Sequence, residues 1–91
     1  MVYNNRAWAL LKAGKAEEAV PDAEKSLELN PNSAPALDTR GSIFEALGRR
    51  DEAIADFRRA LEVAPNNPIV QEATAGGLER LARRNLRIDR N

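Results

Sequence analysis

Apolar residues in the middle of the chain recur with the period of an α-helix. Between residues 34 and 47 they stand at helical spacing, and Gly48 follows where a left-handed residue often ends a helix. Asp51 and Glu52 then occupy the first turn of a second helix, where the helix dipole favours acids. The apolar positions of this second helix form an i, i+3, i+4, i+7, i+8 stripe: Ala53, Ile54, Phe57, Ala60 and Leu61. The pattern predicts a pair of helices that ends before Pro65.

The same pattern occurs once earlier in the chain, at an offset of 34 residues. Nine of the 28 pairs that match residues 6–33 with residues 40–67 are identical, whereas average composition gives about two. The identical pairs include Arg6 with Arg40, Asp22 with Asp56, and the turn glycine at position 14 with that at position 48. The repeat predicts a first pair of helices over about 2–13 and 16–29.

A third unit begins at Pro68 and remains incomplete. Proline is tolerated in the first turn of a helix, and apolar residues continue at helical spacing as far as Ala82. No second stripe follows. We therefore expect repeats over 1–33 and 34–67, a C-terminal capping helix over 68–84 and a polar tail over 85–91. The pair Gly76-Gly77 within this helix indicates either flexibility or a close contact between helices.

Composition excludes several functions. The chain carries 14 Lys+Arg, 14 Asp+Glu, no His and no Cys. The balanced charge argues against a nucleic-acid binder. Without His the chain lacks the commonest general base, and without His and Cys it lacks the commonest zinc ligands. We therefore predict no enzyme activity, no catalytic residues, no cofactor and no metal site.

The first residues do not resemble a signal peptide and no apolar stretch could span a membrane, so we expect a soluble, cytoplasmic protein that does not bind membranes.

The 34-residue pair of helices, with small residues at fixed places and a proline at its end, resembles the tetratricopeptide repeat family. The resemblance implies an all-α fold: a right-handed superhelical solenoid of antiparallel helix pairs, here with five helices. Small residues would lie where paired helices cross closely, because larger side chains would force them apart. The residues that carry this signature are Ala7, Gly14, Ala19, Pro31, Gly41, Gly48, Ala53, Phe57, Ala60 and Pro65.

The resemblance also implies a concave groove lined by the first helix of each pair, in which a partner peptide or helix binds. Trp8 is the strongest candidate, since tryptophan is enriched at the residues that dominate interface energies; the alternative is that it packs against another helix. The groove candidates are Asn4, Asn5, Trp8, Leu11, Lys12, Asp38, Thr39, Ser42 and Glu45, to which the terminal helix adds Glu72, Gly76 and Glu79.

The charges of these positions indicate the kind of partner. Some family members grip a partner's C-terminal carboxylates with lysines, an arginine and asparagines. Asn5 resembles one of that set, but Asp38 and Glu72 stand where cations would help, so we expect no such clamp. The groove should favour an apolar or basic segment of a protein partner.

Three further questions remain open from the sequence. The first helix pair could form a homodimer through its leading face, or stack within a longer repeat array; the chain could also be a regulatory region of a multidomain enzyme. The arginines near the C-terminus fit either a patch for an acidic partner or a solvated helix face: Arg80, Arg83, Arg84, Arg87 and Arg90.

Overall fold

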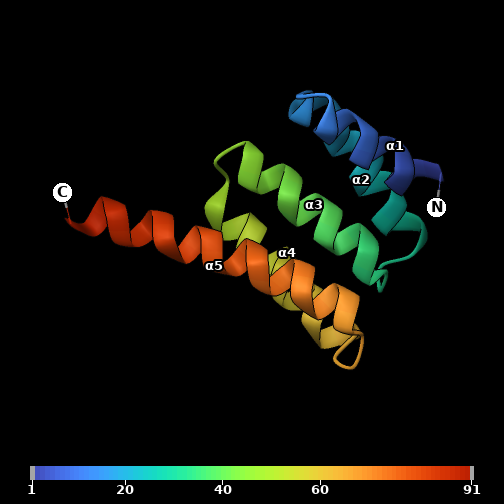
Figure 1. Ribbon diagram of the computed structural model, residues 1–91. Helices are drawn as coiled ribbons and strands as arrows, with labels where there is room; N and C mark the ends of the chain where they lie inside the picture. The colour runs from blue at the N-terminus through green and yellow to red at the C-terminus, as the bar shows by residue number, and fades with distance from the viewer. Residues whose placement is uncertain (1, 91) are drawn as a thin grey trace.

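The computed structural model describes the backbone of residues 2–90 and the side chains of residues 2–84. The chain forms five α-helices over this range, as the sequence predicts, and no strand (Figure 1). Their bounds are α1 Val2–Lys12, α2 Ala16–Leu29, α3 Ala34–Ala46, α4 Arg50–Val63 and α5 Pro68–Arg90. The all-α fold is therefore confirmed.

The expected end of the last helix near residue 84 is wrong. Helix α5 continues to Arg90, so the predicted tail is helical over residues 85–90, and Asn91 lies outside the described residues. The sequence supplies a reason, because residues 85–90 contain neither glycine nor proline and include leucine and arginine, which are good helix formers. Helix propensity continues α5 past the point where the apolar stripe of the sequence ends.

Each helix pair closes through a glycine in the left-handed region of backbone space. Gly14 has a φ of 78° and Gly48 a φ of 76°, the conformation for which glycine is favoured over residues with a Cβ. The backbone N–H that follows each glycine donates a hydrogen bond to a carbonyl in the last turns of the preceding helix. Lys15 N lies 2.9 Å from the Leu10 carbonyl oxygen, and Arg49 N lies 2.8 Å from the Phe44 carbonyl oxygen. The two repeats thus use one turn geometry.

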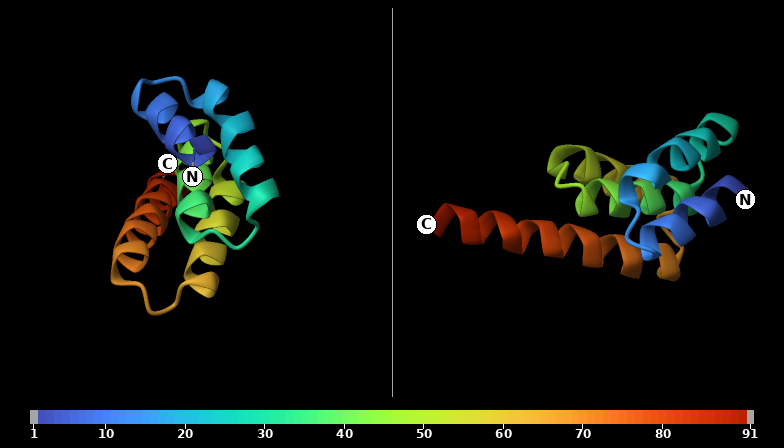
Figure 2. Two further views of the ribbon diagram at one scale, coloured as in Figure 1. Left: turned by 90° about the vertical axis from the view of Figure 1, so that its right-hand side faces the viewer. Right: turned by 90° about the horizontal axis from the view of Figure 1, so that it is seen from above.

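The helices form two layers. The end-on view places α1, α3 and α5 in one layer and α2 and α4 in the other (Figure 2, left). Helix α3 lies at the centre and contacts each of the other four helices. The C-terminal part of α5 extends beyond the body formed by α1 to α4 (Figures 1 and 2). The layer of α1, α3 and α5 is the one that carries the expected groove positions.

Phe57 holds α3, α4 and α5 together. Its side chain is fully buried, and its ring contacts the backbone positions of Gly41 on α3 and Gly77 on α5. A Cβ added at either glycine would lie 2.7 Å from the ring, which is closer than real Cβ atoms come. Gly77 therefore belongs to a close helix contact, one of the two explanations that its sequence allowed.

The first repeat fills the equivalent space differently. There Ala7 replaces Gly41 and Ala23 replaces Phe57, and both alanines are fully buried in a cluster with Ile43. The repeat thus exchanges a glycine and a phenyl ring for two methyl groups. Two alanines fill less volume than a glycine and a phenylalanine, and Ile43 of α3 packs beside them in the first repeat.

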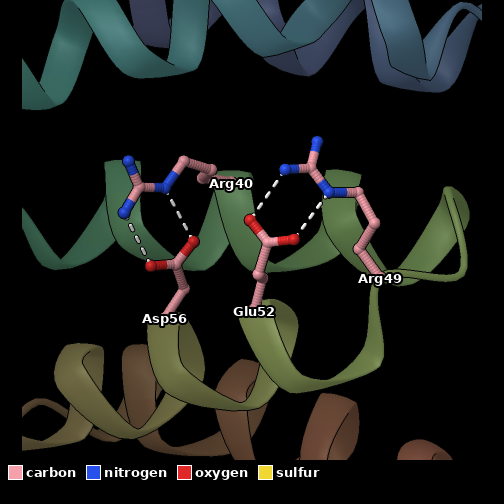
Figure 3. Close-up of polar contacts among 4 residues, drawn as sticks. All are labelled: Arg40, Arg49, Glu52 and Asp56. Carbon is pink, nitrogen blue, oxygen red and sulfur yellow. Dashed lines mark hydrogen bonds and ion pairs between the residues drawn. The ribbon is translucent and has the colours of Figure 1, made fainter.

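An arginine–aspartate pair fastens the two helices of each repeat. Arg6 meets both carboxylate oxygens of Asp22 at 2.6 Å, and Arg40 meets those of Asp56 at 2.7 and 2.8 Å (Figure 3). In the first pair, the hydrogen bond from the Arg6 guanidinium holds the pKa of Asp22 below its usual value. The figure also shows Arg49, in the turn before α4, paired with Glu52. Bidentate pairs of this kind fix orientation as well as distance.

Substitutions at the two adjacent glycines of α5 test the contact with Phe57. Gly77→Ala should lower the free energy of unfolding by about 1–3 kcal/mol, because its Cβ overpacks the ring. Gly76→Ala is the matched control, since its Cβ would meet only the Arg80 guanidinium at 3.5 Å. That variant should gain about 0.5–1 kcal/mol from helix propensity. Urea denaturation measures both, and equal stability of the two variants would contradict the close contact.

Candidate binding groove

Two adjoining cavities lie on the face formed by α1, α3 and α5. The first has a volume of about 270 Å³ and the second about 520 Å³. Trp8, Asp38 and Ala73 line both cavities, one from each helix, so the two cavities meet there and are called the groove below. The first cavity is completed by Asn4, Asn5, Pro35, Thr39, Ile69 and Val70, and the second by Leu11, Lys12, Ser42 and Arg80.

The structure brings together eight of the nine positions expected from α1 and α3. The exception is Glu45, which is buried at 8% exposure and lines neither cavity. Its carboxylate accepts two hydrogen bonds from the Arg80 guanidinium at 2.9 and 3.0 Å, and Arg84 Nη2 lies 3.7 Å away. Glu45 thus joins α3 to α5 rather than facing a partner.

The structure places the residues expected from α5 outside both cavities. Glu72, Gly76 and Glu79 line neither cavity, and the helix instead contributes Ile69, Val70, Ala73 and Arg80. The expectation carried the 34-residue register of the repeats into the last helix. The same register also gives Ala73 and Arg80, the counterparts of Asn5 and Lys12, and both of these line the groove.

Trp8 is the largest exposed side chain of the groove. It is 42% exposed, and the Lys12 ammonium lies 4.6 Å from the centre of its ring. A cation at this distance is attracted by the electrons of the ring face. The tryptophan therefore lines the groove instead of packing into the body of the protein, and its ring already contacts one cation.

Asp38 is a partly buried carboxylate at the junction of the cavities. Its Oδ1 accepts a hydrogen bond from the Thr74 hydroxyl at 3.3 Å. Burial raises its pKa, although the Thr74 hydroxyl and the nearby Arg80 act in the opposite direction. The neighbouring Thr39 offers no comparable group, because its hydroxyl donates to the Pro35 carbonyl at 2.9 Å. Asp38 is therefore a charged group that its surroundings compensate incompletely.

The arginines of α5 differ in what they contact. Arg80 and Arg84 reach Glu45, whereas Arg83 pairs with Glu79 on the same helix. The side chains of Arg87 and Arg90 lie outside the described residues. Arg80 and Arg84 are thus the partners of the buried Glu45. Sequence reasoning missed this, because a charge run does not reveal a partner 35 residues away.

Among the described residues, no three acidic side chains gather in a way that could hold a metal ion. None of the described helices combines the length and the apolar character that crossing a membrane requires. The groove between α1, α3 and α5 brings together most of the positions that the sequence suggested from α1 and α3.

Two stacked pairs of antiparallel helices with a groove along their inner helices define a helical repeat protein. The tetratricopeptide repeat model matches residues 1–33 and again residues 34–67. The chain therefore belongs to the tetratricopeptide repeat family. The two repeats support a role as a protein-interaction scaffold.

Two structures from one human protein are similar to the chain. The second TPR domain of human RPAP3, solved in complex with the HSP70 peptide SGPTIEEVD, is 31% identical with a TM-score of 0.78. This match covers 88% of the chain and 63% of that structure. The first TPR domain of human RPAP3 is 30% identical with a TM-score of 0.76, over 91% of the chain and 65% of that structure.

A bovine protein is similar over a shorter segment. The Bos taurus protein named "Protein SGT1 homolog" is 51% identical over 39 residues, which is 43% of the chain and 12% of the bovine protein. The chain thus spans less than two thirds of either RPAP3 structure and a small part of the bovine protein.

Removing Arg80 tests whether Glu45 seats α5. Arg80→Met should lower the free energy of unfolding by about 1–2 kcal/mol, because a buried carboxylate loses its two hydrogen bonds. Arg83→Met is the control, since its exposed pair with Glu79 should contribute less than about 0.5 kcal/mol. Urea denaturation gives the stability and amide exchange along α5 locates the loss. Equal effects of the two substitutions would show that Glu45 does not seat the helix.

Proposed function

We propose that the chain is a non-enzymatic interaction module that binds a segment of a partner protein in the groove between α1, α3 and α5. The observation that carries the proposal is Trp8, which is 42% exposed where the two cavities meet. Large exposed aromatic side chains in concave surfaces commonly supply much of the binding free energy. The partner segment would lie along the groove and cover this ring.

The lining of the groove favours an apolar or basic segment. The first cavity has apolar walls from Pro35, Ile69 and Val70, and Asp38 is its charged residue. The second cavity contains Lys12 and Arg80, but the Arg80 guanidinium is held by Glu45. Of the two cations that line the groove, Lys12 and Arg80, only Lys12 has no carboxylate partner among the described residues. An acidic segment would therefore meet the like charge of Asp38 and one available cation.

The peptide of the similar RPAP3 structure has a different character. That peptide, SGPTIEEVD, ends in an acidic run. Asp38 would face such a run with like charge. Bringing a second carboxylate close to this half-buried one would cost binding free energy. We infer that the shared fold presents a groove of different selectivity in this chain.

A second candidate role is stacking of the first helix pair on another repeat or on a second copy of the chain. Val2 on α1 is 75% exposed and Leu29 on α2 is 65% exposed, and both lie outside the groove. Burying such side chains would favour association. This role predicts that Leu29, rather than Trp8, controls self-association.

The Trp8→Ala substitution separates the two roles. Peptides selected against the wild-type chain from a random display library should lose about thirtyfold or more in affinity, because a hot-spot residue contributes about 2 kcal/mol. Leu29→Ala is the control and should bind the same peptides with wild-type affinity. Fluorescence anisotropy measures the affinities, and circular dichroism checks that the helices persist. Selected peptides that bind both variants equally well would refute groove binding.

A further inference from the structure

The first cavity of the groove contains hydrogen-bond acceptors that the protein itself leaves without a full set of donors. This matters for the identity of the partner, because a bound segment must supply what a binding site lacks. The following inference rests on the proposed function, and it concerns which side chain of the partner enters this cavity.

Asn4 is the first of these acceptors. The residue lines the cavity from α1 and is only 8% exposed, and its Oδ1 has no hydrogen-bond partner among the described residues. A buried amide oxygen without a donor costs free energy. The oxygen itself is buried, and a half-turn of the amide about its last side-chain bond is what would present it to a donor in the cavity.

Asp38 is the second acceptor. Its described hydrogen bond uses only Oδ1, and through one neutral hydroxyl. Burial raises the pKa of Asp38, because the charged carboxylate has lost part of its hydration. A positive charge brought close to this carboxylate would therefore be favourable. Asn5 also lines the cavity from α1.

The chain's own cations do not line this cavity, although Arg80 lies near Asp38. Lys12 and Arg80 line the second cavity and not the first. The Lys12 ammonium lies against the Trp8 ring, and the Arg80 guanidinium makes both of its described bonds to Glu45. No positively charged side chain of the described residues lines the first cavity.

The remaining walls are apolar. Trp8, Ile69 and Val70 line the cavity, and Ile69 is 79% exposed although it is a large aliphatic residue. Such walls suit the methylene stem of a long side chain, while the acceptors suit a head group that carries several donors. Lysine and arginine combine these properties, since they bury their stems along apolar surface and keep a charged tip for polar partners.

We propose that the first cavity is a pocket for a lysine or arginine side chain of the partner, with its stem against Trp8, Ile69 and Val70 and its head group donating to Asp38 and Asn4. Asp38 is the residue that determines this specificity. A glutamate or aspartate at the same place in a partner is rejected by the charge of Asp38.

Blocked tripeptides test the pocket without knowledge of the natural partner. The probes are N-acetylated, C-amidated Ala-Lys-Ala, the same peptide with norleucine, which keeps the stem without the charge, and the same peptide with glutamate. Each is titrated into the full chain, and the Trp8 indole N–H and the Asn4 side-chain amide are followed by ¹H–¹⁵N NMR.

The lysine peptide should bind about fivefold or more tightly than the norleucine peptide, and the glutamate peptide should bind most weakly. Asp38→Asn should remove the preference for lysine and keep the norleucine affinity. Glu72→Gln is the matched control: it removes one negative charge from exposed surface of α5 outside both cavities, so it should leave the preference intact. Thermal unfolding confirms that both variants are folded.

Two contrary results are distinguishable. Equal binding of the lysine and norleucine peptides, or a lysine preference that survives in Asp38→Asn, would overturn the basic pocket while leaving the groove as a binding site. If none of the three peptides shifts the Trp8 signal, both the pocket and the proposed function fail.

Discussion

The groove depends on how closely α5 approaches α3 and α4, and that approach depends on the ring of Phe57. Gly41 and Gly77 both lie against this ring, at positions where any Cβ would be too close. The contact sets the distance of α5 and contributes to its rotation. Ile69, Val70 and Ala73 therefore face α1 and α3 across the groove. A single core contact thus determines which residues of the last helix a partner would meet.

A polar contact completes this arrangement on the groove side of α3. Glu45 is buried and takes both described hydrogen bonds of Arg80, which would otherwise be a free cation at the second cavity. This pairing affects the electrostatics of the groove, because Arg80, the cation near Asp38, is held by Glu45, and no lysine or arginine of the described residues lines the first cavity. The contact that seats α5 also shapes the selectivity that we propose.

Much of this fold follows from the sequence, because the repeat is visible in it. The offset of 34 residues pairs the turn glycines at positions 14 and 48, and both adopt the left-handed conformation that their position predicts. The same offset pairs Arg6 with Arg40 and Asp22 with Asp56, so the recurring ion pairs could also have been found from the sequence. Local patterns and internal repetition carry this information.

The parts that the sequence could not supply depend on contacts of the last helix. The repeat pattern does not reveal that Gly77 packs on Phe57 or that Arg80 pairs with the buried Glu45. The residues chosen from that pattern for α5 line neither cavity: Glu72, Gly76 and Glu79.

Photo-cross-linking tests the central claim most directly. Benzoylphenylalanine at Ile69, on the groove, should cross-link to a peptide selected for the wild-type chain, and the same group at Leu29, outside it, should not. Cross-linking from Leu29 and none from Ile69 would contradict binding in the groove.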